Sequence, residues 1–463
     1  MTLYVIGFVI AFFFVLLSGL PVGFGLGLLA IGLMTMLTNF DLALTTSIDK
    51  AYSSMDSSIL IAIPLFILAA QLISATGMGK RLFDAAKTLL GGSRSGLGVA
   101  TIASSGVFSA MTGSSFVSAS TMGLIAIPEL RRAGYSDRLI SSAITAGGSL
   151  GSVIPPSIVM IVYGYLTDES IGKLFMAGIV PGILLISLYS IVLSFFVRRE
   201  LNKPIGVGKT VNNSLAESDE YSFDSETQSI AQGITDLETS TKNISVSEAF
   251  IEAFWGIMAP VIILGGIYLG VFTATEAAAV AVVYCMIIGF FVYKSLTIKG
   301  LINVLMEATS TSAMIAIIVI GGAILGHAII YGRVPQDILS VIIDADLSPG
   351  LLMLVINIAL FILGMFMEVL ALMYLAIPLL LPLIAYMQWD NIWFAVIILI
   401  NVNLALITPP LGGVLYVVSH IGNIPLATVI RGAMLPIVIL LFTLLLVILY
   451  PPIATWLPSM MDG

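Results

Sequence analysis

The sequence is poor in cysteine and histidine, and these shortages exclude several kinds of site. Cys285 is the only cysteine among 463 residues, so an internal disulfide is impossible and cysteine usage says little about the compartment. His327 and His420 are the only histidines, which excludes a histidine-rich metal centre. The phosphate-loop pattern Gly-x4-Gly-Lys-Ser/Thr is also absent, so nucleotide-driven pumping by this chain is not expected.

Charged side chains are scarce as well. They make up 10% of the residues, against about 25% in soluble domains, which excludes a soluble globular enzyme and a disordered chain. The net charge of −8 gives no reason to expect nucleic acid as a partner. Hydrophobic residues reach 59%, and apolar runs long enough to cross a bilayer recur along the chain. We therefore predict an all-α polytopic membrane protein that has membrane lipid as its surroundings.

The first apolar run, residues 3–37, is interrupted at Ser18-Gly19-Leu20-Pro21. Neither a basic segment nor a small-residue cleavage site marks it as a removed signal peptide. Pro21 ends or kinks the helix before it, so two short helices are expected here.

Loop charges predict the orientation, because lysine and arginine concentrate in cytoplasmic loops. We assign the basic loops to the cytoplasm, the acidic loops to the outside, and both chain termini to the periplasmic side. The basic residues are Lys80, Arg81, Lys87, Arg94, Arg131, Arg132, Arg138, Arg198, Arg199 and Lys203, whereas Asp41, Asp49, Asp56, Asp168 and Glu169 mark acidic turns.

This orientation predicts a re-entrant hairpin over residues 96–128. Basic loops flank the segment at both ends, and one crossing cannot begin and end on the same side. Each arm would be about 24 Å long, less than the roughly 30 Å hydrocarbon core. The tip, Thr112-Gly113-Ser114-Ser115, should therefore stop inside the membrane.

The next apolar run, residues 139–166, should be a broken helix. Pro155 and Pro156 lack amide hydrogens and cannot continue the helical ladder. Free carbonyls are then expected near mid-membrane, where non-helical backbone is tolerated only beside protein or a water-filled cavity.

The second half repeats these signals in the same order. Ile125-Ala126-Ile127-Pro128 is echoed by Leu375-Ala376-Ile377-Pro378, and Ile154-Pro155-Pro156 by Thr408-Pro409-Pro410. We predict two inverted repeats, residues 1–202 and 248–463, the second with a hairpin at about 350–382 and a broken helix at about 392–418. Between them, residues 203–247 carry seven acidic residues against three lysines, which predicts a flexible cytoplasmic linker. Paired broken helices in inverted halves point to the midplane site of a secondary transporter.

At several motifs the sequence resembles the large membrane subunit of tripartite ATP-independent periplasmic (TRAP) transporters. The motifs are Ile63-Pro64-Leu65-Phe66, the hairpin arm from Thr112 to Pro128, Ala133-Gly134-Tyr135, residues 151–157, Leu174-Phe175-Met176-Ala177-Gly178, and residues 260–281. The resemblance implies an elevator-type carrier in the bacterial inner membrane, driven by Na+ as the coupling ion and without an organic cofactor. It also implies a small four-helix membrane subunit and a periplasmic binding protein that delivers an organic acid, such as a dicarboxylate or sialic acid. The polar insert is longer than this family leads one to expect, and Thr112 stands where serine usually opens the tip.

The resemblance also assigns site residues. Sodium needs oxygen ligands, which hydroxyls and unpaired carbonyls supply without burying a charge. Close helix packing selects the same small residues, so packing stays open as an alternative for each of them. The predicted sodium site 1 comprises Ser109, Thr112, Gly113, Gly151, Ile154 and Pro155, and sodium site 2 comprises Gly364, Ala405, Thr408 and Leu411.

For the substrate we predict contacts with Ser114, Ser115, Ser118 and Glu368. Half-helix N-termini should provide the positive potential for an anion. Glu368 is an intramembrane acid, which suggests a function, but it could equally bond the backbone amides at its own tip. Glu276 is expected to cap a helix N-terminus.

Other functions are weighed against this one. The nearest rival is a stand-alone sodium/dicarboxylate or citrate carrier that needs no binding protein. An intramembrane hydrolase would require a nucleophile with a base at mid-depth, and the aspartates lie in loops. A passive channel is compatible with hairpins, but it would not saturate or depend on a sodium gradient. No catalytic residues are predicted, and the chain is not expected to be an enzyme.

Overall fold

The computed structural model describes residues 11, 14–15, 18–201 and 246–461, and every regular element in this part of the chain is helical. The first half contains α2 (Val22–Leu37), α3 (Phe40–Met55), α4 (Ala62–Ala75), α5 (Met78–Leu90), α6 (Arg94–Thr112), α7 (Ser115–Arg132), α8 (Asp137–Ser149), the 3₁₀ turn η1 (Leu150–Ser152), α9 (Ile158–Thr167) and α10 (Ile171–Leu201). Most of the predicted linker, and most of the chain before Pro21, lie outside the described residues.

The second half begins with two helices and a π-turn and then follows the element order of the first. Its elements are α12 (Val246–Tyr268), α13 (Ala274–Ile287), η2 (Ile288–Val292), α14 (Ile298–Tyr331), α15 (Val334–Asp344), α16 (Pro349–Gly364), α17 (Val369–Tyr386), α18 (Asn391–Leu406), α19 (Gly413–Gly422), α20 (Leu426–Leu449) and α21 (Pro452–Ser459). The series from α14 to α20 has the same order as that from α4 to α10: a helix, a short helix, two hairpin arms, a broken helix and a long helix.

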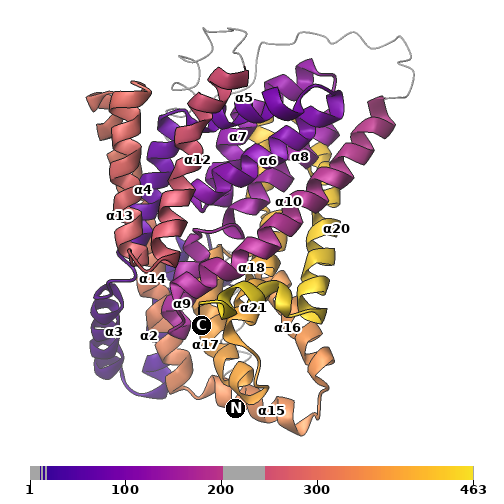
Figure 1. Ribbon diagram of the computed structural model, residues 1–463. Coiled ribbons are helices and arrows are strands. Elements are labelled where there is room, and N and C mark those ends of the chain that lie inside the picture. The colour runs from indigo at the N-terminus through magenta and orange to yellow at the C-terminus, as the bar shows by residue number, and fades with distance from the viewer. Residues whose placement is uncertain (1–10, 12–13, 16–17, 202–245, 462–463) are drawn as a thin grey trace.

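Figure 1 shows α5 to α8 in the upper half of the molecule and α15 to α17 in the lower half. The two helical pairs α6/α7 and α16/α17 therefore approach the middle from opposite ends, as an inverted arrangement requires. The predicted hairpin over residues 96–128 coincides with α6 and α7, and that over 350–382 with α16 and α17.

Capping side chains explain where these helices begin. Ser93 accepts a hydrogen bond from the Gly96 amide at 3.1 Å and starts α6, while Asp390 accepts one from the Trp393 amide at 2.7 Å and starts α18. Each cap satisfies an amide that has no partner within its helix. The predicted cap at Glu276 is confirmed, because Glu276 and Thr273 form a reciprocal capping box at the start of α13.

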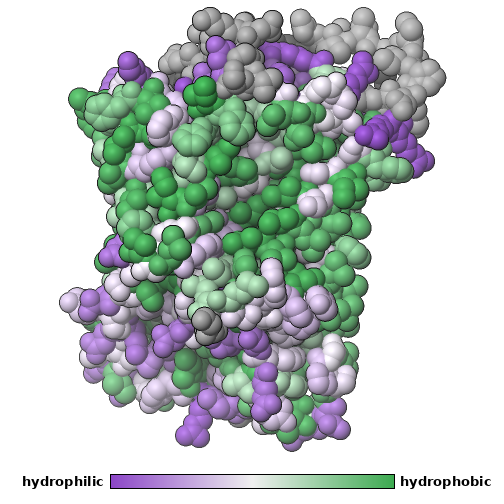
Figure 2. Space-filling model, in the orientation of Figure 1, coloured by the Kyte–Doolittle hydropathy of each residue, from purple (hydrophilic) through white to green (hydrophobic). Residues whose placement is uncertain are grey.

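The molecule has the apolar belt of a membrane protein. Six of the described helices are long and apolar enough to cross a bilayer, and the bent pair α4 and α5 would add a seventh. Figure 2 shows a hydrophobic band around the middle with hydrophilic side chains at both ends. The predicted class, an all-helical polytopic membrane protein, is confirmed.

Packing joins the two halves into one bundle. Helix α14 packs along α2 and α17, α10 packs on α6, and α20 packs on α8. Arg131 donates a hydrogen bond to the Gly422 carbonyl at 2.6 Å. Elsewhere Tyr163 donates to the Asn391 carbonyl at 2.8 Å. These contacts hold α7 to α19 and α9 to α18.

Candidate functional site

The first hairpin turns in two residues. Helix α6 ends at Thr112, Gly113 has a φ of +61°, and Ser114 caps α7 by accepting from the Val117 amide at 3.4 Å. A positive φ favours glycine. A Cβ at Gly113 would also lie 2.3 Å from the carbonyl oxygen of Pro156. Glycine is therefore required both by the turn and by the close approach of the broken helix.

The broken helix lies directly against this tip. After α8 and η1 the chain unwinds and resumes as α9 at Ile158. A Cβ at Gly151 would lie 2.5 Å from the backbone carbonyl of Ser114, so tip and break pack backbone against backbone.

Proline at the break leaves backbone carbonyls without helical donors. The amides that would bond the carbonyls of Gly151 and Ser152 belong to positions 155 and 156, both proline. The second break repeats this pattern, because Pro409 and Pro410 remove the donors for the carbonyls of Ala405 and Leu406. The Ala405 oxygen accepts instead from the Thr408 amide at 3.1 Å. Both breaks thus offer the oxygen atoms that a hard cation requires.

A buried hydroxyl cluster lies behind the first tip. Ser118 is fully buried, and its hydroxyl lies 3.1 Å from that of Ser109 and 3.1 Å from that of Thr112. Ser118 was predicted to bind substrate, but the structure places it with two residues predicted for sodium site 1.

The second tip is built differently. Glu368 caps α17, and one carboxylate oxygen accepts from the amides of Leu370 and Ala371 at 2.9 and 3.2 Å. A Cβ at Gly364 would lie 2.8 Å from that of Ala405, so this tip also packs on its broken helix. Of the other residues predicted for site 2, Thr408 donates to the Leu404 carbonyl at 2.6 Å, and Leu411 has an exposed side chain.

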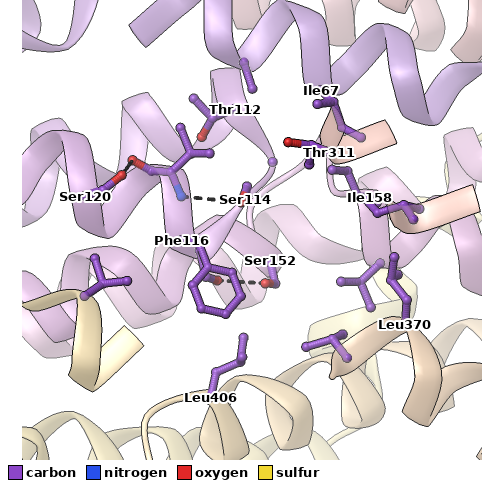
Figure 3. Close-up of a pocket in the computed structure, with 18 of the residues that line it drawn as sticks. Ile67, Thr112, Ser114, Phe116, Ser120, Ser152, Ile158, Thr311, Leu370 and Leu406 are labelled. Carbon is purple, nitrogen blue, oxygen red and sulfur yellow. Dashed lines mark hydrogen bonds between the residues drawn. The ribbon is translucent and has the colours of Figure 1, made fainter. Parts of the chain in front are cut away.

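A cavity of roughly 760 Å³ lies between the two tips. Figure 3 shows Thr112, Ser114 and Ser152 on one side of it, Leu370 and Leu406 on another, and Ile67 with Thr311 on a third. Glu368 and Ser115 also line the cavity. Of the four predicted substrate residues, the structure thus brings Ser114, Ser115 and Glu368 to one space and leaves Ser118 outside its lining.

The cavity is suited to an anion by its helix ends. Neither lysine nor arginine occurs among the described residues that line it. First-turn residues of three helices do line it, from α7, α9 and α17. Helix N-termini carry a partial positive charge. Those of α7 and α9 have no acidic cap and can bind a carboxylate without a basic side chain, whereas the Glu368 carboxylate already bonds the Leu370 and Ala371 amides at the start of α17.

Sequence reasoning missed several polar residues here. Ser115 donates to Asn403 at 3.3 Å and shares a 2.7 Å hydrogen bond with Ser152. Gln71 lines the cavity from α4, and its buried side-chain oxygen has no hydrogen-bond partner among the described residues. Gln71, Asn401 and Asn403 are polar amides within otherwise apolar helices, a signal that could have identified Gln71 and Asn403.

Comparison with known proteins identifies the family of the chain. The family model described as "Tripartite ATP-independent periplasmic transporter, DctM component" matches residues 9–453. The sialic acid TRAP transporter large permease protein SiaM of Vibrio cholerae is 32% identical over 99% of both chains. The C4-dicarboxylate TRAP transporter large permease protein DctM of Pseudomonas aeruginosa is 34% identical over 89% of this chain and 88% of its own.

The fold is also found among solved transporter structures. The YdaH transporter of Alcanivorax borkumensis superimposes with a TM-score of 0.57, covering 92% of this chain and 89% of that chain at 13% identity. At this level of identity the likeness concerns the fold alone.

Proposed function

The chain belongs to the DctM component family of tripartite ATP-independent periplasmic transporters, and we propose that it is the large membrane subunit of a sodium-coupled organic-acid importer. Its partners would be a small membrane subunit and a periplasmic protein that delivers the substrate. The observation that carries the proposal is the meeting of two hairpin tips and two proline breaks around one cavity.

Sodium would bind behind each tip. At the first, the carbonyls of Gly151 and Ser152 and the hydroxyl of Thr112 supply oxygen atoms; at the second, the carbonyls of Ala405 and Leu406 and the hydroxyl of Thr408 do so. A bound cation would order each tip against its break and would add positive potential beside the cavity. Substrate affinity then depends on sodium, which is the requirement for symport.

The substrate would be a carboxylate held by the N-termini of α7 and α9, because Glu368 already bonds the first amides of α17. Hydroxyls of Ser114 and Ser115 would add hydrogen bonds to its polar groups. Related large permeases are named for sialic acid and for C4-dicarboxylates, and a cavity of roughly 760 Å³ has room for either class.

Transport by an elevator movement is part of the proposal. The hairpins and broken helices line most of the cavity, whereas α4 and α14, which pack on each other, close one side of it. Movement of the first group past the second would carry the cavity from one side of the bilayer to the other.

The test is uptake into liposomes that contain the chain and its small subunit. An inward sodium gradient with the loaded binding protein should drive saturable accumulation of a labelled sialic acid or C4-dicarboxylate. Replacement of sodium by potassium should abolish it. Sodium-driven uptake that needs neither partner would identify a stand-alone carrier, and uptake that ignores the gradient would overturn the proposal.

A further inference from the structure

Asn403 connects the two halves of the site. It lies near the end of α18, its side chain is 0% exposed, and its Oδ1 atom accepts a hydrogen bond from the Ser115 hydroxyl at 3.3 Å. Its amide nitrogen donates to the Leu399 carbonyl at 2.8 Å. That second bond fixes the orientation of the side chain, so the acceptor oxygen is held toward the first tip.

Ser115 links Asn403 to the first proline break. Its hydroxyl also shares a 2.7 Å hydrogen bond with Ser152, whose carbonyl lacks a helical donor. Gly151 allows the backbones of tip and break to touch. The three side chains of Ser152, Ser115 and Asn403 thus form one chain of hydrogen bonds from the first break, through the first tip, to α18.

The opposite side of α18 touches the second tip. Ala405 lies two residues after Asn403, about 200° further around the helix. Its methyl group faces Gly364, where an added Cβ would come within 2.8 Å. The end of α18 is therefore held between the two tips, with Asn403 on one side and Ala405 on the other.

From this arrangement we propose that Asn403 is a positioning residue that couples the two predicted sodium sites, so that sodium binds to them cooperatively. The inference rests on the proposed function, because it assumes both sites. Sodium at either break orders the tip that packs on it. Through the Ser115–Asn403 bond, order at the first tip restrains the end of α18, where the carbonyls of the second site begin. Reciprocity requires the same effect in the other direction.

Asn403→Ala tests the coupling, and the variant is expected to remain folded. The substitution leaves Ser115 bonded to Ser152, so no buried hydroxyl loses its last partner. In sodium-driven uptake the Hill coefficient should fall from about 2 toward about 1, and half-saturation should require at least about 5-fold more sodium. Ser115→Ala should lower the Hill coefficient in the same way and, because Ser115 also lines the cavity, should weaken substrate affinity. The double variant should change the Hill coefficient little beyond either single one.

Two further variants separate coupling from mere stability. Asn401→Ala is the matched control, because Asn401 is an equally buried amide on the same helix whose hydrogen bonds go to Asn357 within the second half. It should retain the Hill coefficient of the unmodified chain. Asn403→Asp keeps an acceptor oxygen toward Ser115 and should restore part of the cooperativity that Asn403→Ala removes.

Hydrogen exchange provides a readout that does not depend on transport. In the purified complex, sodium should slow amide exchange in residues 112–118 and 364–371, and both segments should reach half of this effect at the same sodium concentration. In Asn403→Ala the two segments should have different midpoint concentrations. Sodium activation with an unchanged Hill coefficient and a shared midpoint in Asn403→Ala would overturn this inference alone. Absence of sodium dependence in the unmodified chain would overturn the proposed function as well.

Discussion

Thr112 ends the first arm of the first hairpin, Thr408 lies at the second proline break, and each already uses its hydroxyl proton. Thr112 bonds the Phe108 carbonyl at 3.1 Å, and Thr408 bonds the Leu404 carbonyl at 2.6 Å. Each hydroxyl proton is thus donated to the carbonyl four residues earlier in the chain, and a lone pair on the hydroxyl oxygen stays available for a cation. This pattern is what a hydroxyl ligand on a helix end requires.

We predict that Thr112→Ala and Thr408→Ala each weaken sodium activation. A lost oxygen contact of about 1 kcal/mol corresponds to a roughly 5-fold higher sodium requirement. Thr→Ser at each position retains the hydroxyl and should behave as the unmodified chain. Uptake measured as a function of sodium concentration tests this prediction. Unchanged sodium activation in both alanine variants would contradict the assignment of these threonines to sodium sites.

Gly151→Ala should abolish transport with only a modest loss of stability. The new methyl would press on the Ser114 carbonyl from 2.5 Å, and relief by separating tip and break costs about 1–3 kcal/mol. Gly265→Ala is the control, because nothing lies within 4 Å of a Cβ at that helical position. Thermal unfolding and sodium-driven uptake of the two variants should separate packing from transport.

Among the helices, capping residues and prolines determine where the hairpin arms and the broken helices begin and end. Ser93, Ser114 and Glu368 start helices, and consecutive prolines interrupt them. The Glu368 carboxylate bonds backbone amides at its own tip and so caps α17, which is one of the two roles expected for it. The same residue also lines the cavity. Transport measurements on Glu368→Gln would separate the cap from any contact with substrate.

The segment between the halves should tolerate shortening. Residues 203–247 are polar and have little apolar periodicity, so no packed element depends on them by sequence. Deletion of about 20 of these residues still leaves enough chain to join α10 to α12. Insertion into the membrane and uptake should both remain near the level of the unmodified chain. Normal insertion with lost uptake would reveal a function in this segment.

At the scale of the whole molecule, the inverted arrangement predicts opposite exposure of equivalent loops. In a Cys285→Ala background, Arg132→Cys follows the first hairpin and Asp344→Cys precedes the second; both replace exposed side chains. A membrane-impermeant maleimide should label Asp344→Cys in intact cells, and Arg132→Cys only after the inner membrane is permeabilised. Labelling of both from the same side would contradict the inverted topology and the predicted orientation.

Much of this architecture could be predicted because membrane proteins obey few, strong rules. The apolar runs predicted helices, and the loop charges with the short arm from Gly96 to Met111 predicted a re-entrant hairpin where the structure has the helix pair α6 and α7. The family was also identified from motifs such as those around Pro64 and Pro156, and the family match confirms it. The site was harder, because serine, glycine and threonine serve packing and ion binding alike. Ser118 illustrates this, since its place behind the tip and not in the cavity depends on the rotation of α7.

The helical class, the breaks at Pro155 and Pro409 and the turn at Gly113 could be read from the order of the amino acids, because these features follow from local backbone chemistry. Which groups meet depends on the packing of the whole bundle: the helix N-termini around one cavity, the close approach of Gly151 to Ser114, and the hydrogen bond between Ser115 and Asn403. The last pair is separated by 288 positions. Contacts over such a distance depend on how every intervening helix packs, and no local pattern contains that information.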